Sequence, residues 1–252
     1  MAKKIINQYS PKAIISDESP FAMVEAYKAA RTSLMFILDS EATKKNSIVF
    51  TSYSPMEGKS TVTLNLAITF SQIGAKVLVI DADMRKPSLE KYLDIKVDKG
   101  LADILSSDKV DYKDCIVDTK TENLYLLPAG NIPPNPTELL ISEKTEKLLE
   151  ELSPEYDYIF IDSPPLGLVT DAAILGSKTE GIINIVNCEK SKSADISSIK
   201  SSLEQANIKL IGSIINNVEL DIGKRSNYNS SYYYSNSQLS EKKEKQTNNK
   251  ND

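Results

Sequence analysis

Residues 51 to 61 have the composition of a phosphate-binding loop. They read Thr-Ser-Tyr-Ser-Pro-Met-Glu-Gly-Lys-Ser-Thr and lie between a predicted strand and a predicted helix. Gly58 lets the backbone approach a phosphate closely, and successive N–H groups at the helix N-terminus attract its negative charge. Lys59 would reach the β- and γ-phosphates, and the Ser60 hydroxyl would complete a Mg²⁺ shell. The predicted nucleotide site therefore comprises Pro55, Met56, Glu57, Gly58, Lys59, Ser60 and Thr61, with Lys59 exposed in a crevice.

Two features leave an alternative open for this segment. The first glycine of the GxxxxGK(S/T) pattern is replaced by Tyr53. Gly-Lys-Ser-Thr alone would also be compatible with the start of an ordinary capped helix.

Three carboxylates follow two other predicted strands. Asp81 and Asp83 come after the strand at 76–80, and Asp162 comes directly after the strand at 158–161. The carboxyl ends of parallel strands face one crevice, where these groups would repel each other and lose hydration without a cation. Either strand end alone is equally well explained as a turn. Together with the loop, they predict a Mg-nucleotide site in which Asp162 is the main magnesium partner and Ser60 and Asp81 contribute.

Short, continuously apolar runs must position these groups. They alternate with stretches of helical length and spacing, which is typical of strands buried on both faces of a parallel sheet. The pattern predicts a doubly wound α/β fold of the P-loop NTPase class, with helices on both faces of a mostly parallel sheet. The predicted strands are 47–51, 76–80, 124–127, 158–161, 181–186 and 210–215, and the predicted helices are 60–73, 136–152 and 194–206.

The two ends of the chain differ from this central part. Residues 1–18 are predicted to be an extended lead-in, and a helix is predicted over 20–38, with Ser19 as its N-cap. Residues 223–252 are almost entirely polar, so they cannot bury enough apolar surface to offset their ordering entropy. We therefore expect a folded domain over 19–222 and a disordered tail over 223–252.

Composition excludes several classes of function. The chain has no histidine, which removes Ser-His-Asp triads and His-ligated zinc. Its two cysteines have no short spacing, which removes a disulfide framework and a CxxC pair. The net charge is −5, and because the tail carries +3, the remaining residues carry −8, which argues against a nucleic-acid partner. No apolar run is long enough to predict insertion into a membrane.

The combined motifs resemble one family, the bacterial tyrosine kinases of capsule and exopolysaccharide synthesis. The resemblance covers about residues 15–235 and rests on Gly58-Lys59-Ser60, Asp81-x-Asp83-x-Arg85-x-Pro87 and Asp162-Ser-Pro-Pro165. Leu127-Pro-Ala-Gly130 and the following Pro133-Pro-Asn-Pro136-x-Glu-Leu-Leu140 also match. It implies an ATP- and Mg²⁺-dependent protein-tyrosine autokinase that regulates polysaccharide synthesis and export. Its implied catalytic residues are Lys59, Asp81, Asp83, Arg85 and Asp162, and Asn216 matches a residue that contacts adenine in related ATPases.

The resemblance also gives meaning to two segments outside the nucleotide site. The tail holds Tyr228, Tyr232, Tyr233 and Tyr234, which in the family form the autophosphorylation cluster, although tail aromatics can also be incidental. Glu25, Lys28 and Arg31 follow the spacing of a family subunit contact that closes a ring, in which each tail enters a neighbour's active site. A solvated charged face is the alternative. Lys28 departs from the family arginine and lacks its bidentate fork.

The resemblance further implies partners and a location. The chain is similar to the split form of the family, which works with a separate transmembrane adaptor and would lie at the cytoplasmic face of the membrane. A protein-tyrosine phosphatase would reverse its reaction. Two other functions share the fold: a septum-site or partition ATPase acting as a nucleotide-switched dimer, and a catalytically silent ATP-binding scaffold. The signature lysine of the partition class is replaced here by Ser54.

Overall fold

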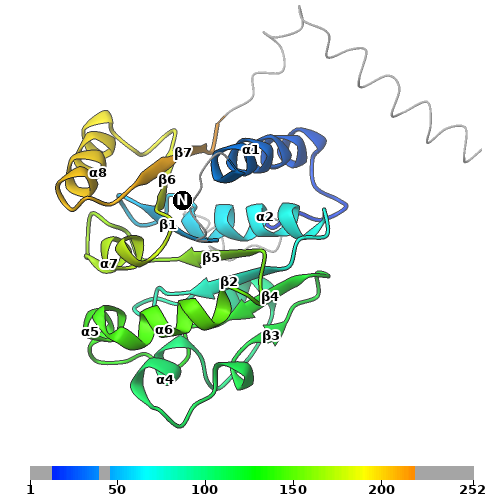
Figure 1. Ribbon diagram of the computed structural model, residues 1–252. Helices are drawn as coiled ribbons and strands as arrows, with labels where there is room; N and C mark the ends of the chain where they lie inside the picture. The colour runs from blue at the N-terminus through cyan, green and yellow to red at the C-terminus, as the bar shows by residue number, and fades with distance from the viewer. Residues whose placement is uncertain (1–12, 40–45, 219–252) are drawn as a thin grey trace, which may run out of the picture. The chain divides into compact units, whose positions relative to one another are not determined.

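A seven-stranded sheet forms the centre of the molecule in a computed structural model that describes residues 13–39 and 46–218 (Figure 1). The strand order is β3-β4-β2-β5-β1-β6-β7. All neighbours are parallel except β3 and β4, which confirms the predicted doubly wound α/β class. The strands are β1 (Ser47–Ser52), β2 (Val77–Asp81), β3 (Val117–Asp118), β4 (Leu124–Leu127), β5 (Tyr158–Asp162), β6 (Ile182–Asn187) and β7 (Leu210–Asn216).

Helices cover both faces of this sheet, and each face has its own apolar core. One core packs β1 and β5 side chains such as Phe50 and Phe160 against α1 and α2. The other packs Leu78, Ile159 and their neighbours against α4 to α8. The helices are α1 (Phe21–Asp39), α2 (Lys59–Ser71), α3 (Leu89–Leu93), α4 (Leu101–Ser106), α5 (Pro136–Ile141), α6 (Glu143–Leu152), α7 (Asp171–Lys178) and α8 (Ser193–Gln205), with a short 3₁₀ turn at Tyr112–Asp114.

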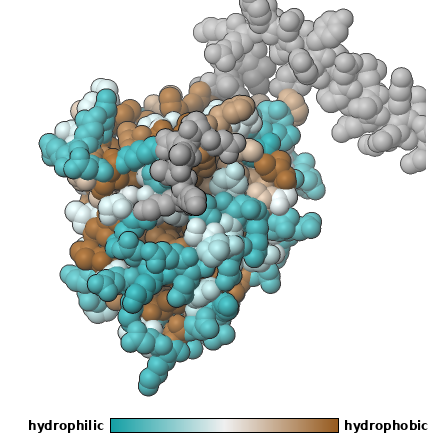
Figure 2. All heavy atoms as spheres, viewed as in Figure 1, coloured by the Kyte–Doolittle hydropathy of each residue, from teal (hydrophilic) through white to brown (hydrophobic). Residues whose placement is uncertain are grey.

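The central strands are buried on both faces, as their continuous apolar runs predict. Every residue of β1, β2 and β6 is buried. The edge strand β7 is different, because Ile215 is exposed. Figure 2 shows apolar residues gathered over this edge, between α8 and α1.

The single helix predicted over 136–152 is wrong in one respect. Ser142 has extended backbone angles (φ −58°, ψ 154°), so α5 ends before it and α6 begins after it. The hydroxyl of Ser142 donates to the carbonyl of Leu139 at 2.6 Å, which closes the end of α5. The short elements α3, α4, α7 and β3 were not predicted, because segments this short carry little periodicity.

Helix α1 begins one residue later than predicted, and its predicted cap is wrong. The Ser19 hydroxyl accepts the backbone N–H of Ser16 at 3.0 Å, and the N–H groups of Met23 and Val24 donate to the carbonyl of Pro20. Leu34 is buried against α2, with Tyr27 half-buried beside it. No helix within the described ranges is long and apolar enough to cross a membrane. Residues 1–12 of the lead-in predicted over 1–18, the domain end at 222 and the tail lie outside the described residues.

Candidate functional site

The phosphate loop connects the end of β1 to the start of α2. Gly58 has a left-handed backbone (φ 91°), which favours glycine. A Cβ atom at Gly58 would also lie 2.0 Å from the side-chain nitrogen of Asn216. Met56 has φ 63°, so two residues of the loop are left-handed. The α2 N-terminus, with its unpaired backbone N–H groups, therefore follows directly on a tight turn suited to an anion.

Lys59 lies in a cluster of carboxylates. Its ammonium is 2.7 Å from Asp162 and 3.9 Å from Asp83, and the residue is only 8% exposed. The prediction that Lys59 is exposed is therefore wrong, because its side chain is buried in an ion pair with Asp162, although it still lines the cavity that opens over the site. Burial by itself would lower the pKa of Lys59, but the charges of Asp162 and Asp83 outweigh it and raise the pKa above its ordinary value.

Asp81 is completely buried beside this cluster. One carboxylate oxygen accepts the backbone N–H groups of Ser88 and Leu89, each at 3.0 Å, and the other accepts that of Asp83 at 3.2 Å. The sheet register pairs Asp81 directly with Asp162. Burial, and then repulsion by Asp162, raises the pKa of Asp81 to about 7. Asp81 thus holds the loop after β2 in place.

Asp162 has one oxygen available for a ligand. Its Oδ1 accepts from Lys59, whereas Oδ2 is buried and has no hydrogen-bond partner within the described part of the chain. The Ser60 hydroxyl lies 3.2 Å from the Lys59 ammonium and 3.2 Å from the Ser88 hydroxyl. A carboxylate oxygen without a partner, on a residue that shares Lys59 with the P-loop hydroxyl, fits Mg²⁺, which is usually held by one or two carboxylates together with phosphates and water. The described residues contain no group of three or more acidic or cysteine side chains that could hold a metal alone.

A cavity of about 620 Å³ opens over these groups. Among the predicted site residues, Glu57, Asp81 and Asp162 do not line it. Glu57 is buried, and its carboxylate accepts the Ser54 N–H at 3.1 Å and the Ser191 hydroxyl. The predicted residues that line the cavity are Pro55, Met56, Gly58, Lys59, Ser60, Thr61, Asp83, Arg85 and Asn216.

Asn216 lies at the end of β7, on the far side of β1 from Asp162. Its side-chain nitrogen donates to the carbonyl of Glu57 at 3.0 Å. The ammonium of Lys190 donates to the carbonyl of Met56 at 3.2 Å. The loops after β6 and β7 therefore hold the phosphate loop from this side, where Asn187 and Asn217 also line the cavity.

Arg85 is held by two residues that the sequence did not single out. Its guanidinium donates to both oxygens of Asp171, at 2.9 and 3.2 Å, and to the Thr137 hydroxyl at 2.7 Å. Asp171 is buried at the start of α7, and the bond to it raises the pKa of Arg85. Thr137 occupies the variable position of the proline-rich motif Pro133–Leu140, so the sequence pattern already indicated that this segment matters. No sequence pattern indicated Asp171, because α7, which it begins, was not predicted.

The three residues of α1 that were predicted to form a subunit contact differ in their partners. Glu25 and Lys28 form an ion pair at 2.9 Å, and both side chains are nearly half exposed. Arg31 instead donates to the carbonyl of Thr69 on α2 at 2.6 Å. Arg31 thus joins two helices of one chain. Tyr228, Tyr232, Tyr233 and Tyr234 lie outside the described residues.

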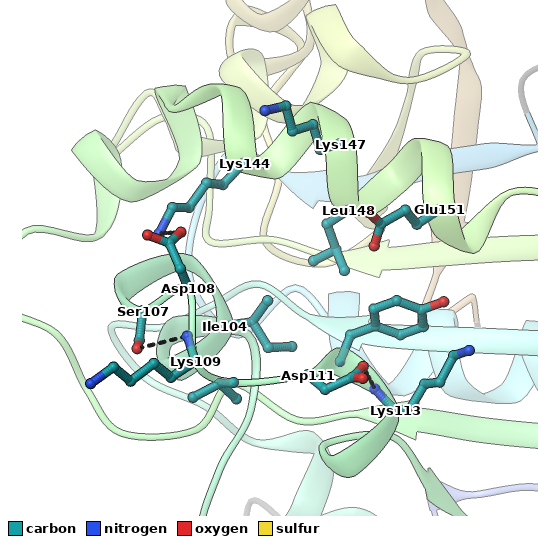
Figure 3. Close-up of a pocket in the computed structure, with 12 residues that line it drawn as sticks. Ile104, Ser107, Asp108, Lys109, Asp111, Lys113, Lys144, Lys147, Leu148 and Glu151 are labelled. Atoms are coloured by element: carbon teal, nitrogen blue, oxygen red, sulfur yellow. Dashed lines mark hydrogen bonds and ion pairs between the residues drawn. The ribbon is translucent and has the colours of Figure 1, made fainter.

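A second cavity, of about 440 Å³, lies between α4 and α6 (Figure 3). Both lysines and acidic residues line it, and Lys144 pairs with Asp108 at 2.7 Å. None of the predicted site residues lines it.

Comparison with known proteins places these features in context. Residues 48–222 match a family described as an AAA domain. The chain is similar to the tyrosine-protein kinase YwqD of Bacillus subtilis, with 33% identity over 234 residues, covering 93% of this chain and 92% of YwqD. It is also similar to the solved chimerical protein CapA2B2 (34% identity, TM-score 0.71, 75% of this chain and 84% of that one). A more distant structure is the septum-site protein MinD of Pyrococcus horikoshii complexed with Mg-ADP (30% identity, TM-score 0.58, 68% and 69% of the two chains).

Proposed function

Since the chain belongs to the bacterial tyrosine kinases of capsule and exopolysaccharide synthesis, we propose that its phosphate cavity transfers the γ-phosphoryl group of ATP to tyrosines of its own C-terminal segment. The observation that carries the proposal is the convergence of Lys59, Asp83 and Asp162 beneath a left-handed phosphate loop. In the reaction the phenolic oxygen forms a bond to the γ-phosphorus. The bond from that phosphorus to the bridging oxygen breaks, ADP leaves, and the phenolic proton passes to a base.

The residues divide the work of holding the phosphates. The backbone N–H groups after Gly58 bind the negative oxygens, and Lys59 stabilises the charge of the transferring group. Ser60 and the unpartnered oxygen of Asp162 would hold Mg²⁺, which neutralises phosphate charge when bound. A septum-site relative complexed with Mg-ADP supports this ligand. Asn216 would lie on the adenine side, since it ends β7 and lines the cavity on the far side of the phosphate loop from Asp162.

Geometry favours Asp83 over Asp81 as the group that orients the acceptor hydroxyl. A phenol has a pKa near 10, so it needs a nearby base or a transition state that demands little deprotonation. From the sequence, Asp81 is the candidate for this role. Its oxygens accept three backbone N–H groups and do not reach the cavity, whereas Asp83 lines the cavity. Burial raises the pKa of Asp83 as well, which suits a proton acceptor.

The wider proposal concerns assembly and location. A ring-like homo-oligomer would use Glu25 and Lys28 at the surface of α1, with Arg31 fixing that helix to α2. Each tail would then present Tyr228, Tyr232, Tyr233 and Tyr234 to a neighbouring cavity. A transmembrane adaptor would hold the protein at the cytoplasmic face of the membrane and a tyrosine phosphatase would reset it. The similarity to a chimerical protein, CapA2B2, supports work with a second polypeptide.

Labelled ATP distinguishes the proposed reaction from its alternatives. Purified protein is incubated with Mg²⁺ and ATP labelled at the γ position, with and without replacement of the four tail tyrosines by phenylalanine. We expect label on tyrosine in the wild type and little in the variant, with equal ADP binding in both. Release of free phosphate alone would favour a partition-type ATPase, and binding without turnover would favour a silent scaffold.

A further inference from the structure

The loop between β5 and α7 places an exposed leucine at the mouth of the phosphate cavity. Leu168 is 65% exposed, and it lines the cavity together with Pro164, Pro165 and Val169. These four residues, here called the apolar lip, follow directly on Asp162 and Ser163. The cavity floor beside them is charged, because Lys59 and Asp83 also line it. An apolar lip is thus joined to a polar floor.

Backbone hydrogen bonds hold this lip in a fixed position. The N–H of Leu166 donates to the backbone carbonyl of Ser52 at 2.8 Å, and that of Gly167 donates to the backbone carbonyl of Tyr53 at 3.1 Å. The N–H groups of Leu168 and Val169 both donate to the carbonyl of Pro165. A Cβ atom at residue 167 would lie 2.4 Å from the carbonyl oxygen of Tyr53, so only glycine permits this approach. Leu168 is therefore displayed by a built turn that is tied to the phosphate loop.

The sheet order separates the lip from the adenine side of the cavity. Strand β1, which leads into the phosphate loop, lies between β5 and β6. The lip follows β5, whereas Asn187 and Asn216 end β6 and β7 on the other side. The two groups line the same cavity from opposite sides of the phosphate loop. A base bound among the asparagines would leave the lip free for a second substrate.

We propose that Pro165, Leu168 and Val169 form the acceptor subsite, packing against the ring of the substrate tyrosine so that its hydroxyl points to Asp83 and the transferable phosphate. This inference rests on the proposed function and names the surface that selects its substrate. A tyrosine ring is apolar on its faces and polar at one end, which matches an apolar lip beside a charged floor. Arg85 and Lys86 also line the cavity, beside Asp83, and their positive charge suits an incoming acceptor that leaves as a phosphate ester.

The test uses the full chain with its four tail tyrosines replaced by phenylalanine, and a synthetic peptide copying residues 225–236 as the acceptor. In this background, Leu168→Ala removes the exposed leucine side chain of the lip, and Leu168→Met retains an apolar side chain of similar size. Ile132→Ala is the matched control, because Ile132 is also 65% exposed but does not line the cavity. The readouts are the KM and kcat for the peptide, the affinity for Mg-ADP, and the melting temperature.

We expect Leu168→Ala to lower kcat/KM for the peptide by about tenfold, as loss of an apolar contact in a substrate pocket does. Leu168→Met should recover most of this loss, and Ile132→Ala should behave like the parent. Mg-ADP affinity should be unchanged throughout. An equal loss in Mg-ADP affinity would instead assign the lip to the nucleotide, and an unchanged peptide kcat/KM would also overturn the inference. Absence of any phosphotyrosine from the wild-type chain would contradict the proposed function itself.

Discussion

Replacing Lys59 by methionine tests whether this lysine supports the fold as well as the chemistry. The substitution keeps most of the side-chain volume and removes the ammonium that lies 2.7 Å from Asp162. Asp162 is 0% exposed, so its carboxylate would remain buried without its partner, close to Asp81 and Asp83. Removing one member of a buried ion pair costs about 3 to 5 kcal/mol, which corresponds to a melting temperature lower by roughly 10 °C in a domain of this size.

The chain contains a control with the same pair at the surface. Lys144 and Asp108 also lie 2.7 Å apart, but Asp108 has an 88% exposed side chain. Lys144→Met should therefore leave the melting temperature unchanged, because an exposed carboxylate regains water when its partner leaves. The double variant Lys59→Met, Asp162→Asn removes the uncompensated charge and should recover part of the stability without recovering any kinase activity.

Urea denaturation followed by circular dichroism would give the free energies of unfolding, and phosphotyrosine formation would give the activity. Equal stability of Lys59→Met and Lys144→Met would refute the argument that the carboxylates depend on Lys59. Wild-type phosphotyrosine levels in Lys59→Met would refute the assignment of Lys59 to phosphoryl transfer. The sequence alone suggests that this substitution leaves the fold intact, and the buried ion pair is the reason to expect otherwise.

Three further predictions concern single residues around the site. Asp171→Asn should lower stability by about 1.5 kcal/mol, the loss of one charge-assisted hydrogen bond to a partly exposed Arg85, and calorimetry would measure it; a lower kcat with unchanged Mg-ADP affinity should accompany it, and unchanged values for both would contradict the bracing of Arg85. The pKa of Asp81 is about 7 in the folded state against an ordinary value of 3.8, so between these values the folded state retains a proton that the unfolded state has lost. The contribution of Asp81 to the free energy of unfolding should therefore fall as the pH rises from about 4 to about 7. Urea denaturation across that range should show this fall in the difference between the free energies of unfolding of the wild type and of Asp81→Asn, and a flat or rising difference would disprove it. Arg31→Ala should lower stability by about 1 kcal/mol because it removes the bond to Thr69, whereas Lys28→Ala should change only sedimentation; equal melting temperatures for the two variants would restore a purely surface role for Arg31.

Local pattern alone was sufficient for the architecture and for the position of the phosphate loop. Short, continuous apolar runs such as 47–51 and 158–161, alternating with stretches of helical length, are typical of strands in the middle of a parallel sheet, so the α/β class followed from the residues. Gly58 was predictable because its backbone conformation is a property of the turn itself. Asp81, Asp83 and Asp162 were predictable as a group because each ends a buried strand or follows its end.

Other features depend on contacts between distant segments. Lys59 is buried because Asp162, 103 residues away, accepts its ammonium. Asp81 is withdrawn from the cavity because three backbone N–H groups of the following loop close around it. Asp171 binds Arg85 only because the fold brings the start of α7 beside the loop that carries Arg85. No local pattern encodes the partner of such a group.

The sequence by itself thus determined which reactive side chains the protein contains and at which strand ends they lie. Tertiary structure decided which of these groups meet each other and which reach the cavity. The physical reason is that strand and helix periodicities are local properties of the backbone and its nearest side chains. The protonation and accessibility of a carboxylate depend instead on desolvation and on charges a few ångströms away, which come from anywhere in the chain. Asp81 and Asp83 stand two residues apart, and only the folded chain distinguishes the one that braces a loop from the one that lines the cavity.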